Sequence, residues 1–248
     1  MLTSQRKAHL LARLAADGRL VAATLATELG LSEDTIRRDL RELAAEGRLV
    51  RVHGGALPAS PTHVPLATRR GMATQEKARL GRAAVALLQP GQVVILDGGT
   101  THLALIAALP ADLPLTIVTH SPTIATALEP LPAIEVLLIG GRLFRHSMVA
   151  VGAAAAAGFA RVRADLCFLG VTGVSPETGL TTGDAEEAEV KRVMMAQAGE
   201  TVVLATSDKI GTSSPFVIAP LGAASRLILP SEAAVPADTG AWPRLLRA

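Results

Sequence analysis

Ser32-Glu-Asp-Thr-Ile-Arg-Arg-Asp-Leu40 is the stretch from which the organisation of the chain can be predicted. Ser32 is a favourable N-cap, because its hydroxyl can accept a hydrogen bond from a free N–H at the start of a helix. Ile36, Leu40 and Leu43 recur at i, i+4 and i+7, so they predict a helix over residues 33–46 with one apolar face. Gly47 predicts its end, since glycine readily takes the left-handed conformation that commonly follows a helix.

The segments on both sides of this helix complete a recognisable pattern. Apolar residues at helical spacing predict a helix over residues 4–16 and a second one over 21–29, with Gly30-Leu31 as a tight connection. Residues 48–52 predict a short strand, and Gly54-Gly55 predict a turn after it. Two short helices joined by a glycine-containing turn and followed by a basic hairpin are typical of a winged helix-turn-helix.

The charges favour the same interpretation. The chain has 248 residues and a formal net charge of +2. Residues 1–56 hold nine Lys and Arg against seven Asp and Glu, whereas residues 57–248 hold fifteen of each. The predicted contacts with double-stranded DNA, divided between base edges and phosphates, are Ser32, Thr35, Arg37, Arg38, Arg41, Arg48, Arg51 and His53. An ordinary amphipathic helix with a solvated charged face is the alternative for residues 33–46.

After this unit the pattern changes. Residues 57–70 contain three prolines and neither helical nor strand periodicity, which predicts a partly extended linker. Thr74 is a predicted N-cap for a helix that ends before Pro90-Gly91. Beyond it, strands are predicted at 93–96, 115–119, 134–139, 165–169, 201–205 and 226–229, and helices at 102–108, from 122, at 153–160 and at 185–198. This alternation predicts a Rossmann-like, mostly parallel α/β domain.

We therefore predict a winged helix-turn-helix over residues 1–57, a linker over 58–73 and an α/β sensor domain over 74–248. No apolar run approaches the ~18 residues that span a membrane. No signal-peptide pattern is present, which predicts a cytoplasmic protein. The single cysteine, Cys167, excludes an intrachain disulfide and is most simply a buried apolar residue.

In an open parallel sheet, ligands bind at the carboxyl ends of the strands. Asp97-Gly-Gly-Thr-Thr101 lies between a predicted strand and a predicted helix. Its glycines would let the backbone approach an anion, which the Thr100 and Thr101 hydroxyls and free N–H groups could hold. The alternative is a plain strand-to-helix turn. The chain has neither a Walker A motif nor Gly-x-Gly-x-x-Gly at its first strand, which disfavours nucleotide binding of those types.

Other polar residues follow the later strands. His120 and Ser121 end the second strand, where a lone histidine is more often structural, and no second ligand at metal spacing accompanies it. Arg142 could bind an anion with its planar fork or be solvated. Lys191 could be a ligand or form a surface ion pair four residues along its helix. Lys209, in a loop after a strand, is the better ligand candidate.

Several motifs carry a family resemblance. Arg6-x-x-x-Leu10, Ser32-x-x-Thr-Ile-Arg-Arg-Asp-Leu40 and His53-Gly-Gly-Ala56 together resemble the N-terminal signature of DeoR-family transcriptional regulators. The resemblance continues to about residue 229 through Asp97-Gly-Gly-Thr-Thr101, Val118-Thr-His-Ser121, Gly140-Gly141, Asp165-x-x-Phe-x-Gly-x-x-Gly173, Gly179-Leu-Thr-Thr182 and Glu189-x-Lys191. The family usually has Asn where this chain has His120, and Asp-x-Ser-Lys where it has Thr206-Ser-Asp-Lys209.

The resemblance implies a sensor domain similar in fold to ribose-5-phosphate isomerase that binds a phosphorylated sugar or related metabolite, with no cofactor. The effector-binding residues that it implies, taken with those above, are Asp97, Gly98, Gly99, Thr100, Thr101, His120, Ser121, Gly141, Arg142, Lys191 and Lys209. The expected function is that of an operator-binding repressor of a carbohydrate-metabolism operon, acting as a homo-oligomer (a dimer or tetramer).

Two other classes of protein are alternatives. A sugar-phosphate isomerase with an appended helical domain is the main alternative. Gly170 and Val171 argue against it, because such enzymes resemble one another in having a run of acidic residues at these positions, and this chain lacks that run. A pure protein-interaction module would leave the arginine cluster without a purpose. The expectation is therefore a regulator and not an enzyme.

Overall fold

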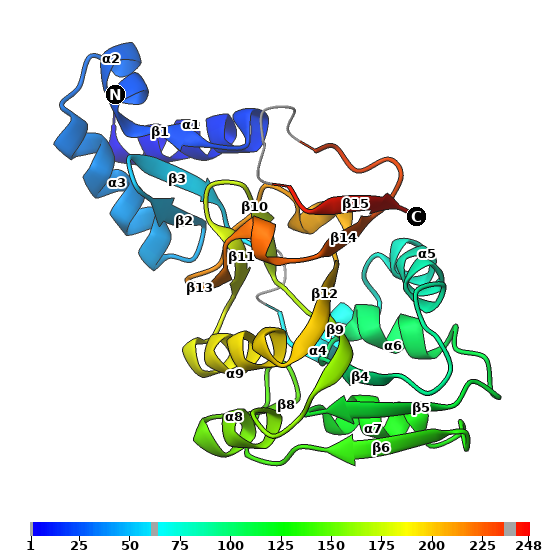
Figure 1. Ribbon diagram of the computed structural model, residues 1–248. Coiled ribbons are helices and arrows are strands. Elements are labelled where there is room, and N and C mark those ends of the chain that lie inside the picture. Colours follow the sequence, from blue (N-terminus) through cyan, green and yellow to red (C-terminus); the bar gives the residue numbers. More distant parts are fainter. Residues whose placement is uncertain (1, 61–63, 236–241) are drawn as a thin grey trace.

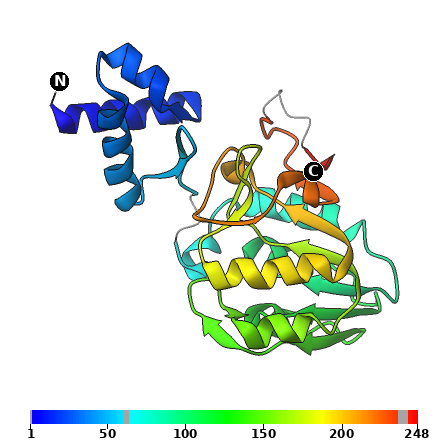
Figure 2. The same ribbon diagram turned by 60° about the vertical axis from the view of Figure 1, so that its left-hand side comes forward.

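The computed structural model describes residues 2–60, 64–235 and 242–248 and shows an α/β protein in two parts (Figure 1). A small N-terminal unit precedes a larger domain built on a seven-stranded parallel sheet. Figure 2 shows the N-terminal unit as a separate body beside the larger domain. The predicted fold class, a winged helix-turn-helix followed by a mostly parallel α/β domain, is confirmed.

The N-terminal unit packs its helices on a three-stranded sheet of order β1-β3-β2. Its elements are α1 (Thr3–Asp17), β1 (Leu20–Val21), α2 (Ala22–Leu29), α3 (Glu33–Ala45), β2 (Leu49–Val52) and β3 (Gly55–Pro58). Ile36, Leu40 and Leu43 of α3 are at most 2% exposed and share one core with the other two helices. An ion pair between Arg6 and the buried Asp39 ties α1 to α3. These helices confirm the prediction to within about one residue at each end.

Two details of this unit bear on the predictions. The Ser32 Oγ accepts a hydrogen bond from the Thr35 N–H at 3.2 Å, so Ser32 is the N-cap of α3 as predicted. Gly55 does not close the turn but begins β3, which is a correction. Its partner strand β1 comes so close that a Cβ on Gly55 would lie 1.8 Å from the Leu20 carbonyl oxygen. Glycine at this position is therefore required by strand packing and not by the turn.

The larger domain is organised by its parallel sheet, of order β15-β14-β12-β9-β4-β5-β6. Its strands are β4 (Val93–Leu96), β5 (Leu115–Thr119), β6 (Ile134–Leu138), β9 (Ala164–Leu169), β12 (Ala198–Leu204), β14 (Arg226–Leu229) and β15 (Arg244–Arg247). In the interior strand β4, Ile95 pairs with Cys167 of β9 and Val118 of β5. Cys167 is fully buried, and burial raises the pKa of its thiol. It packs as an apolar residue, as predicted.

Helices cover both faces of this sheet, as the continuous apolar strands require. On one face lie α5 (Thr74–Val85), α6 (Thr100–Ile106) and α7 (Pro122–Leu128), and on the other α8 (Ala153–Phe159) and α9 (Ala185–Ala196) (Figure 1). Trp242, just before β15, packs against the core that includes α8 and α9. No helix in the described part of the chain is long and apolar enough to cross a membrane.

Several strands were not predicted. A hairpin of β7 (Arg142–Phe144) and β8 (Val149–Val151) follows β6, and β10 (Gly173–Ser175), β11 (Gly179–Thr182) and β13 (Phe216–Ala219) form a second small sheet. Short 3-10 helices, η2 (Ser207–Lys209) and η3 (Leu221–Ala223), lie beside it. The C-terminal strand β15 was not predicted either. Each missed strand has only three or four residues, too few to show an alternating pattern.

The predicted linker is more structured than expected. Residues 57–58 belong to β3, and residues 66–69 form the helical turn α4 (Leu66–Arg69). Residues 61–63 of that linker lie outside the described residues. Thr74 is the first residue of α5 and not its cap, because Ala73 occupies the cap position without a side-chain hydrogen bond. The segment also lies against the larger domain, since the backbone N–H groups of Ser60 and Leu66 donate to the carbonyl oxygens of Ser213 and His146.

Candidate functional site

The predicted DNA-binding face consists of exposed basic side chains on α3 and the β2–β3 hairpin. Those exposed are Arg37, Arg38, Arg41, Arg48, Arg51 and His53. Arg37 pairs with Glu33 at 2.6 Å. Within the described part of the chain, the other four arginines have no carboxylate at ion-pair distance. Unpaired guanidinium groups are free to contact phosphates or base edges, which is what a recognition helix and its wing need.

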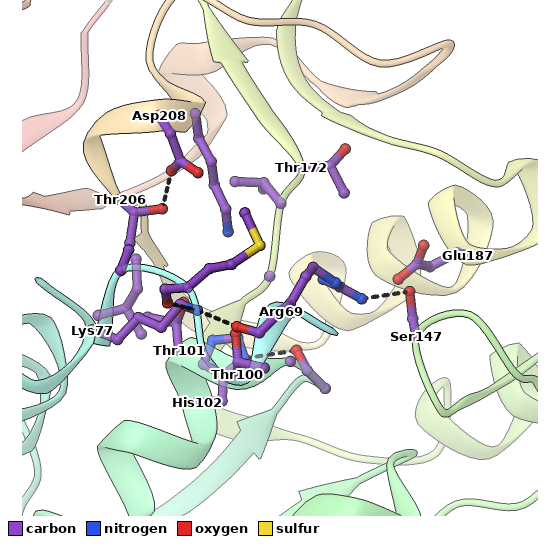
Figure 3. A pocket seen from close by; sticks show the side chains of 18 of the residues that line it. Arg69, Lys77, Thr100, Thr101, His102, Ser147, Thr172, Glu187, Thr206 and Asp208 are labelled. Atoms are coloured by element: carbon purple, nitrogen blue, oxygen red, sulfur yellow. Dashed lines mark hydrogen bonds between the residues drawn. The ribbon is translucent and has the colours of Figure 1, made fainter. Parts of the chain in front are cut away.

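A second site, which we call the sensor pocket, lies where β4, β9 and β12 end (Figure 3). It is a cavity of about 50 Å³. Its walls come from the loop into α6, the loop after β9, α9, η2 and the segment of α4 and α5. The lining residues are Arg69, Met72, Ala73, Lys77, Gly98, Gly99, Thr100, Thr101, His102, Ser147, Gly170, Val171, Thr172, Glu187, Lys191, Leu204, Thr206, Asp208 and Lys209.

Asp97 lies beneath this pocket and is fully buried. Its carboxylate accepts hydrogen bonds from the backbone N–H groups of Gly98 at 2.6 Å and Gly170 at 2.8 Å, and it pairs with the Lys191 ammonium. Burial alone would raise the pKa of Asp97, but the charge of Lys191 and the hydrogen bond from His120 outweigh it and lower the pKa. Asp97 is therefore ionised, and its carboxylate oxygens already accept hydrogen bonds from groups of the protein.

His120 is the fourth donor to Asp97 and is also fully buried. Its Nε2 lies 2.8 Å from Asp97 Oδ1, and its Nδ1 lies 2.6 Å from the carbonyl oxygen of Ala150. Both ring nitrogens are therefore engaged by groups of the protein, and neither is left for a ligand. Of the two interpretations offered by the sequence, the structure supports the structural one.

Lys191 is 3% exposed, so the predicted ion pair with Glu187, four residues earlier on the helix, is present but buried and not at the surface. Its ammonium contacts Asp97 and the carbonyl oxygen of Gly170 at 2.8 Å, with Glu187 at 3.4 Å. A Cβ on Gly170 would lie 2.9 Å from Asp97 Oδ2, so only glycine fits above this cluster. The charges of Lys191 and Asp97 largely compensate each other below the pocket.

The remaining cations of the pocket are less well compensated. Lys209 is 9% exposed, and in the part of the chain that the structure describes its ammonium has neither an acceptor nor a carboxylate at ion-pair distance. Burial lowers its pKa to about 8. The Lys77 ammonium donates to the carbonyl oxygens of Arg69 (2.7 Å) and Met72. Lys209 thus offers an anion a buried positive charge with no competing partner.

His102 supplies a different group. It is 2% exposed, and its Nδ1 lies 2.9 Å from the carbonyl oxygen of Gly98, to which it must donate. Burial lowers the pKa of His102 to about 4, so the ring is neutral near pH 7. Its Nε2 is then an acceptor, and it is buried at the pocket without a partner among the described residues. A hydroxyl group is the natural donor to such an atom.

The structure brings together six of the eleven predicted effector residues. Gly98, Gly99, Thr100, Thr101, Lys191 and Lys209 line the sensor pocket, and five others do not. Asp97 and His120 lie buried beneath it, where protein groups use their polar atoms. Ser121 is buried with its hydroxyl at 3.0 Å from the carbonyl oxygen of Met148. These three corrections have one cause, because the strand ends that carry them are covered by other chain segments.

The other two residues lie in the unpredicted β7–β8 hairpin region. Arg142 begins β7, is exposed and pairs with Glu186. Gly141 precedes it, with φ of 158° and the carbonyl oxygen of Val151 3.0 Å from its would-be Cβ. Both lie outside the pocket lining, because the chain forms the β7–β8 hairpin at this point and does not run along the pocket. No group of side chains among the described residues has the composition of a metal site.

Sequence reasoning missed Arg69, Lys77 and His102. A signal existed for Lys77, which is in register with Leu80 and Ala84 on the buried face of α5. The same holds for Lys191, which lies on the buried face of α9 with Met194. A lysine in an apolar stripe is therefore a candidate for an internal site. Arg69 carried no such signal.

The two parts together define a DNA-binding regulator with a separate sensor domain. The chain matches the DeoR-like helix-turn-helix domain over residues 6–62 and the DeoR C terminal sensor domain over residues 72–230. The protein belongs to the DeoR family of transcriptional regulators.

Relatives that match most of the chain are named as regulators. The chain is 36% identical over 217 residues to the HTH-type transcriptional regulator GlpR of Haloferax volcanii, covering 86% of this chain and 84% of that protein. It is 32% identical over 240 residues to the HTH-type transcriptional repressor GlcR of Bacillus subtilis, covering 94% and 92%. The glycerol-3-phosphate regulon repressor of Escherichia coli is 29% identical over 215 residues, covering 86% and 85%. The alternative of an isomerase is therefore set aside: the chain is a regulator and not an enzyme.

Solved structures show more distant similarity. Ribose 5-phosphate isomerase A of Methanocaldococcus jannaschii is 19% identical with a TM-score of 0.40, covering 54% of this chain and 53% of that one. The sorbitol operon regulator SorC of Klebsiella pneumoniae is 14% identical with a TM-score of 0.36, covering 79% and 87%.

Proposed function

We propose that the protein is a sequence-specific repressor of a carbohydrate-metabolism operon, and that a phosphorylated sugar or related metabolite in the sensor pocket relieves or modulates its DNA binding. Membership of the DeoR family supports DNA binding, and the relatives include a glycerol-3-phosphate regulon repressor and the repressor GlcR. A protein with this role works where the operator DNA is, in the cytoplasm.

The ligand class rests on one observation above all, the buried Lys209 ammonium in the sensor pocket, which no carboxylate of the described residues approaches to ion-pair distance. Charge-assisted hydrogen bonds to phosphate oxygens are strong, and a phosphate would give this ammonium the partner that it lacks. The neutral His102 Nε2 and the hydroxyls of Thr100 and Thr101 suit the hydroxyl groups of a sugar. An anionic end and a hydroxylated body are the two features of a sugar phosphate.

The DNA contacts follow from the exposed face of the N-terminal unit. We assign α3 to the major groove, where Thr35, Arg37, Arg38 and Arg41 meet base edges and phosphates, with Ser32 at its start. Arg48, Arg51 and His53 contact the backbone from the wing. The proposed boundaries are residues 1–57 for this domain, 58–73 for the linker and 74–248 for the sensor. Symmetric operators favour symmetric proteins, so the proposed state is a homodimer or homotetramer.

Fluorescence anisotropy on DNA from upstream of the protein's own coding sequence tests this proposal. Binding should weaken strongly between about 50 and 200 mM salt, because phosphate contacts release counterions. A phosphorylated sugar should change the affinity, whereas the same sugar without phosphate should not, which makes glucose 6-phosphate with glucose and fructose 6-phosphate with fructose matched pairs. Absence of DNA binding by the folded protein would contradict the proposal. An equal effect of sugar and sugar phosphate would contradict the ligand class.

A further inference from the structure

The segment between the two domains is attached to the sensor domain on both sides of residues 61–63. Before them, Ser60 donates through Oγ to the carbonyl oxygen of Thr172 at 2.6 Å, and its backbone N–H donates to that of Ser213 at 3.1 Å. After them, the Leu66 N–H donates to the carbonyl oxygen of His146 at 2.9 Å, and the Leu66 side chain is 3% exposed. This segment is therefore a docked part of the sensor domain.

One of its docking partners, and a neighbour of another, are also walls of the sensor pocket. Thr172 lines the pocket, and so does Ser147, next to His146. Both residues, together with Glu187, also line a cavity of about 310 Å³ that lies between the domains. The opposite wall of that cavity includes Ala44, at the end of α3, and Leu49 of β2. Ser147, Thr172 and Glu187 thus line both the sensor pocket and the cavity that the end of α3 faces.

Arg69 is where this segment enters the pocket (Figure 3). Its guanidinium makes only long hydrogen bonds, at 3.5 Å to the carbonyl oxygen of His146 and at 3.5 Å to Ser147 Oγ. Its Nε is buried without a partner, and no carboxylate of the described residues lies at ion-pair distance. A guanidinium has five N–H donors in a planar fork that fits phosphate oxygens, so most of its hydrogen-bonding capacity is unused here.

The carbonyl end of α4 is fixed by a second residue of the pocket. The Lys77 ammonium donates to the carbonyl oxygens of Arg69 and Met72, which joins α4 to α5. Between them Ala73 has φ of 47°, a left-handed conformation that alanine seldom takes. The backbone next to Arg69 is thus held in an unfavourable state, and such states occur at sites that switch.

We propose that Arg69 binds the anionic group of the effector, and that this contact holds the interdomain segment on the sensor pocket and so transmits occupancy to the DNA-binding domain. This proposal rests on the proposed function, because it needs an anion in the same pocket. A ligand acts on an equilibrium only through a difference in affinity between two states. The Arg69 contact provides that difference, since it exists only when α4 is docked and the pocket is occupied.

The test compares Arg69→Gln with Arg70→Gln in the full-length protein. Arg70 is the exposed neighbour of Arg69, so its replacement removes the same charge from the same segment without reaching the pocket. Calorimetric titration with glucose 6-phosphate, fructose 6-phosphate, fructose 1-phosphate and glycerol 3-phosphate first identifies a probe that binds the wild type. We expect Arg69→Gln to weaken that probe at least tenfold and Arg70→Gln to change it less than twofold.

Hydrogen–deuterium exchange separates transmission from simple binding. With saturating probe, the amides of residues 64–72 should exchange more slowly in the wild type and in Arg70→Gln. In Arg69→Gln, at a probe concentration that gives equal occupancy, they should exchange as in the free protein, and the effect of the probe on DNA affinity should be lost.

The outcomes are distinguishable. Equal affinity of Arg69→Gln and the wild type for the probe would overturn the role of Arg69 and leave the proposed function intact. Weakened binding without any change in exchange at residues 64–72 of the wild type would overturn the transmission. If none of the probes binds the wild type, the proposed ligand class fails, and this inference fails with it.

Discussion

The Asp97 carboxylate joins several segments of the chain beneath the sensor pocket through its hydrogen bonds and its ion pair with Lys191. We expect Asp97→Asn to lower the free energy of unfolding by about 3 kcal/mol, since removing one partner of a buried ion pair typically costs about 3–5 kcal/mol and Glu187 still faces Lys191. Urea unfolding followed by circular dichroism measures this. Asp112→Asn, an exposed change in the same domain, is the control and should stay within about 0.5 kcal/mol. Equal stability of both variants would show that the cluster contributes nothing.

Lys209 gives the sensor pocket a pH dependence. Its pKa is lowered to about 8, so the ammonium is charged below pH 8 and neutral above it. Affinity for a sugar phosphate should therefore fall as pH rises from 7 to 9. The phosphate is already a dianion over this range, because its second pKa is about 6. Titrations of the wild type and Lys209→Gln at several pH values check this. A similar decline in the variant would assign the dependence to another group.

Individual site residues were predictable only where a local sequence pattern determines their position. Glycine and threonine next to a strand end predicted the loop of residues 98–101 at the pocket, because a parallel sheet places such loops together. The same rule also predicted that Asp97 and His120 bind the effector, whereas both lie buried beneath the pocket. Whether a polar side chain at a strand end points into the pocket or below it depends on what covers it, and the covering segments come from elsewhere in the chain.

At the scale of elements, α3 carries the sharpest prediction. Arg38→Ala should weaken operator binding by about 1–3 kcal/mol if its guanidinium reads a base, since Arg38 is exposed and unpaired within the described residues. Arg13→Ala is a control, because Arg13 is a half-buried arginine of α1 that pairs with Asp17 and Glu28 outside the predicted face. Anisotropy on the upstream DNA gives both values. Equal effects of the two changes would remove Arg38 from the list of contacts.

Elements with strong periodicity were predicted well, and short ones were not. The strands β4, β5 and β9 appeared as apolar runs, because both faces of the sheet are covered. The sheet of β10, β11 and β13 joins residues 173–182 with residues 216–219, and such a distant pairing leaves no local pattern. Its strands are nevertheless what brings Thr172 and the interdomain segment together.

At the scale of the molecule, the predicted boundary after residue 57 can be tested by truncation. Residues 58–248 retain both main cores of the larger domain, whereas the core of the first unit lies within residues 10–56. We expect this fragment to fold, to bind the sugar phosphate that the full protein binds and to lose all DNA affinity. Circular dichroism, calorimetry and anisotropy measure the three properties. A fragment that unfolds would show that the two parts form one cooperative unit.

The position of Trp242 determines what an optical experiment on this protein can see. The chain contains one tryptophan and no tyrosine, so its ultraviolet emission comes from a single indole. That indole packs beside β15, at the opposite edge of the sheet from β6. Emission during denaturation therefore reports the release of the C-terminal strand, while ellipticity reports the helices. If the emission midpoint precedes the ellipticity midpoint, the sheet comes apart from its β15 edge.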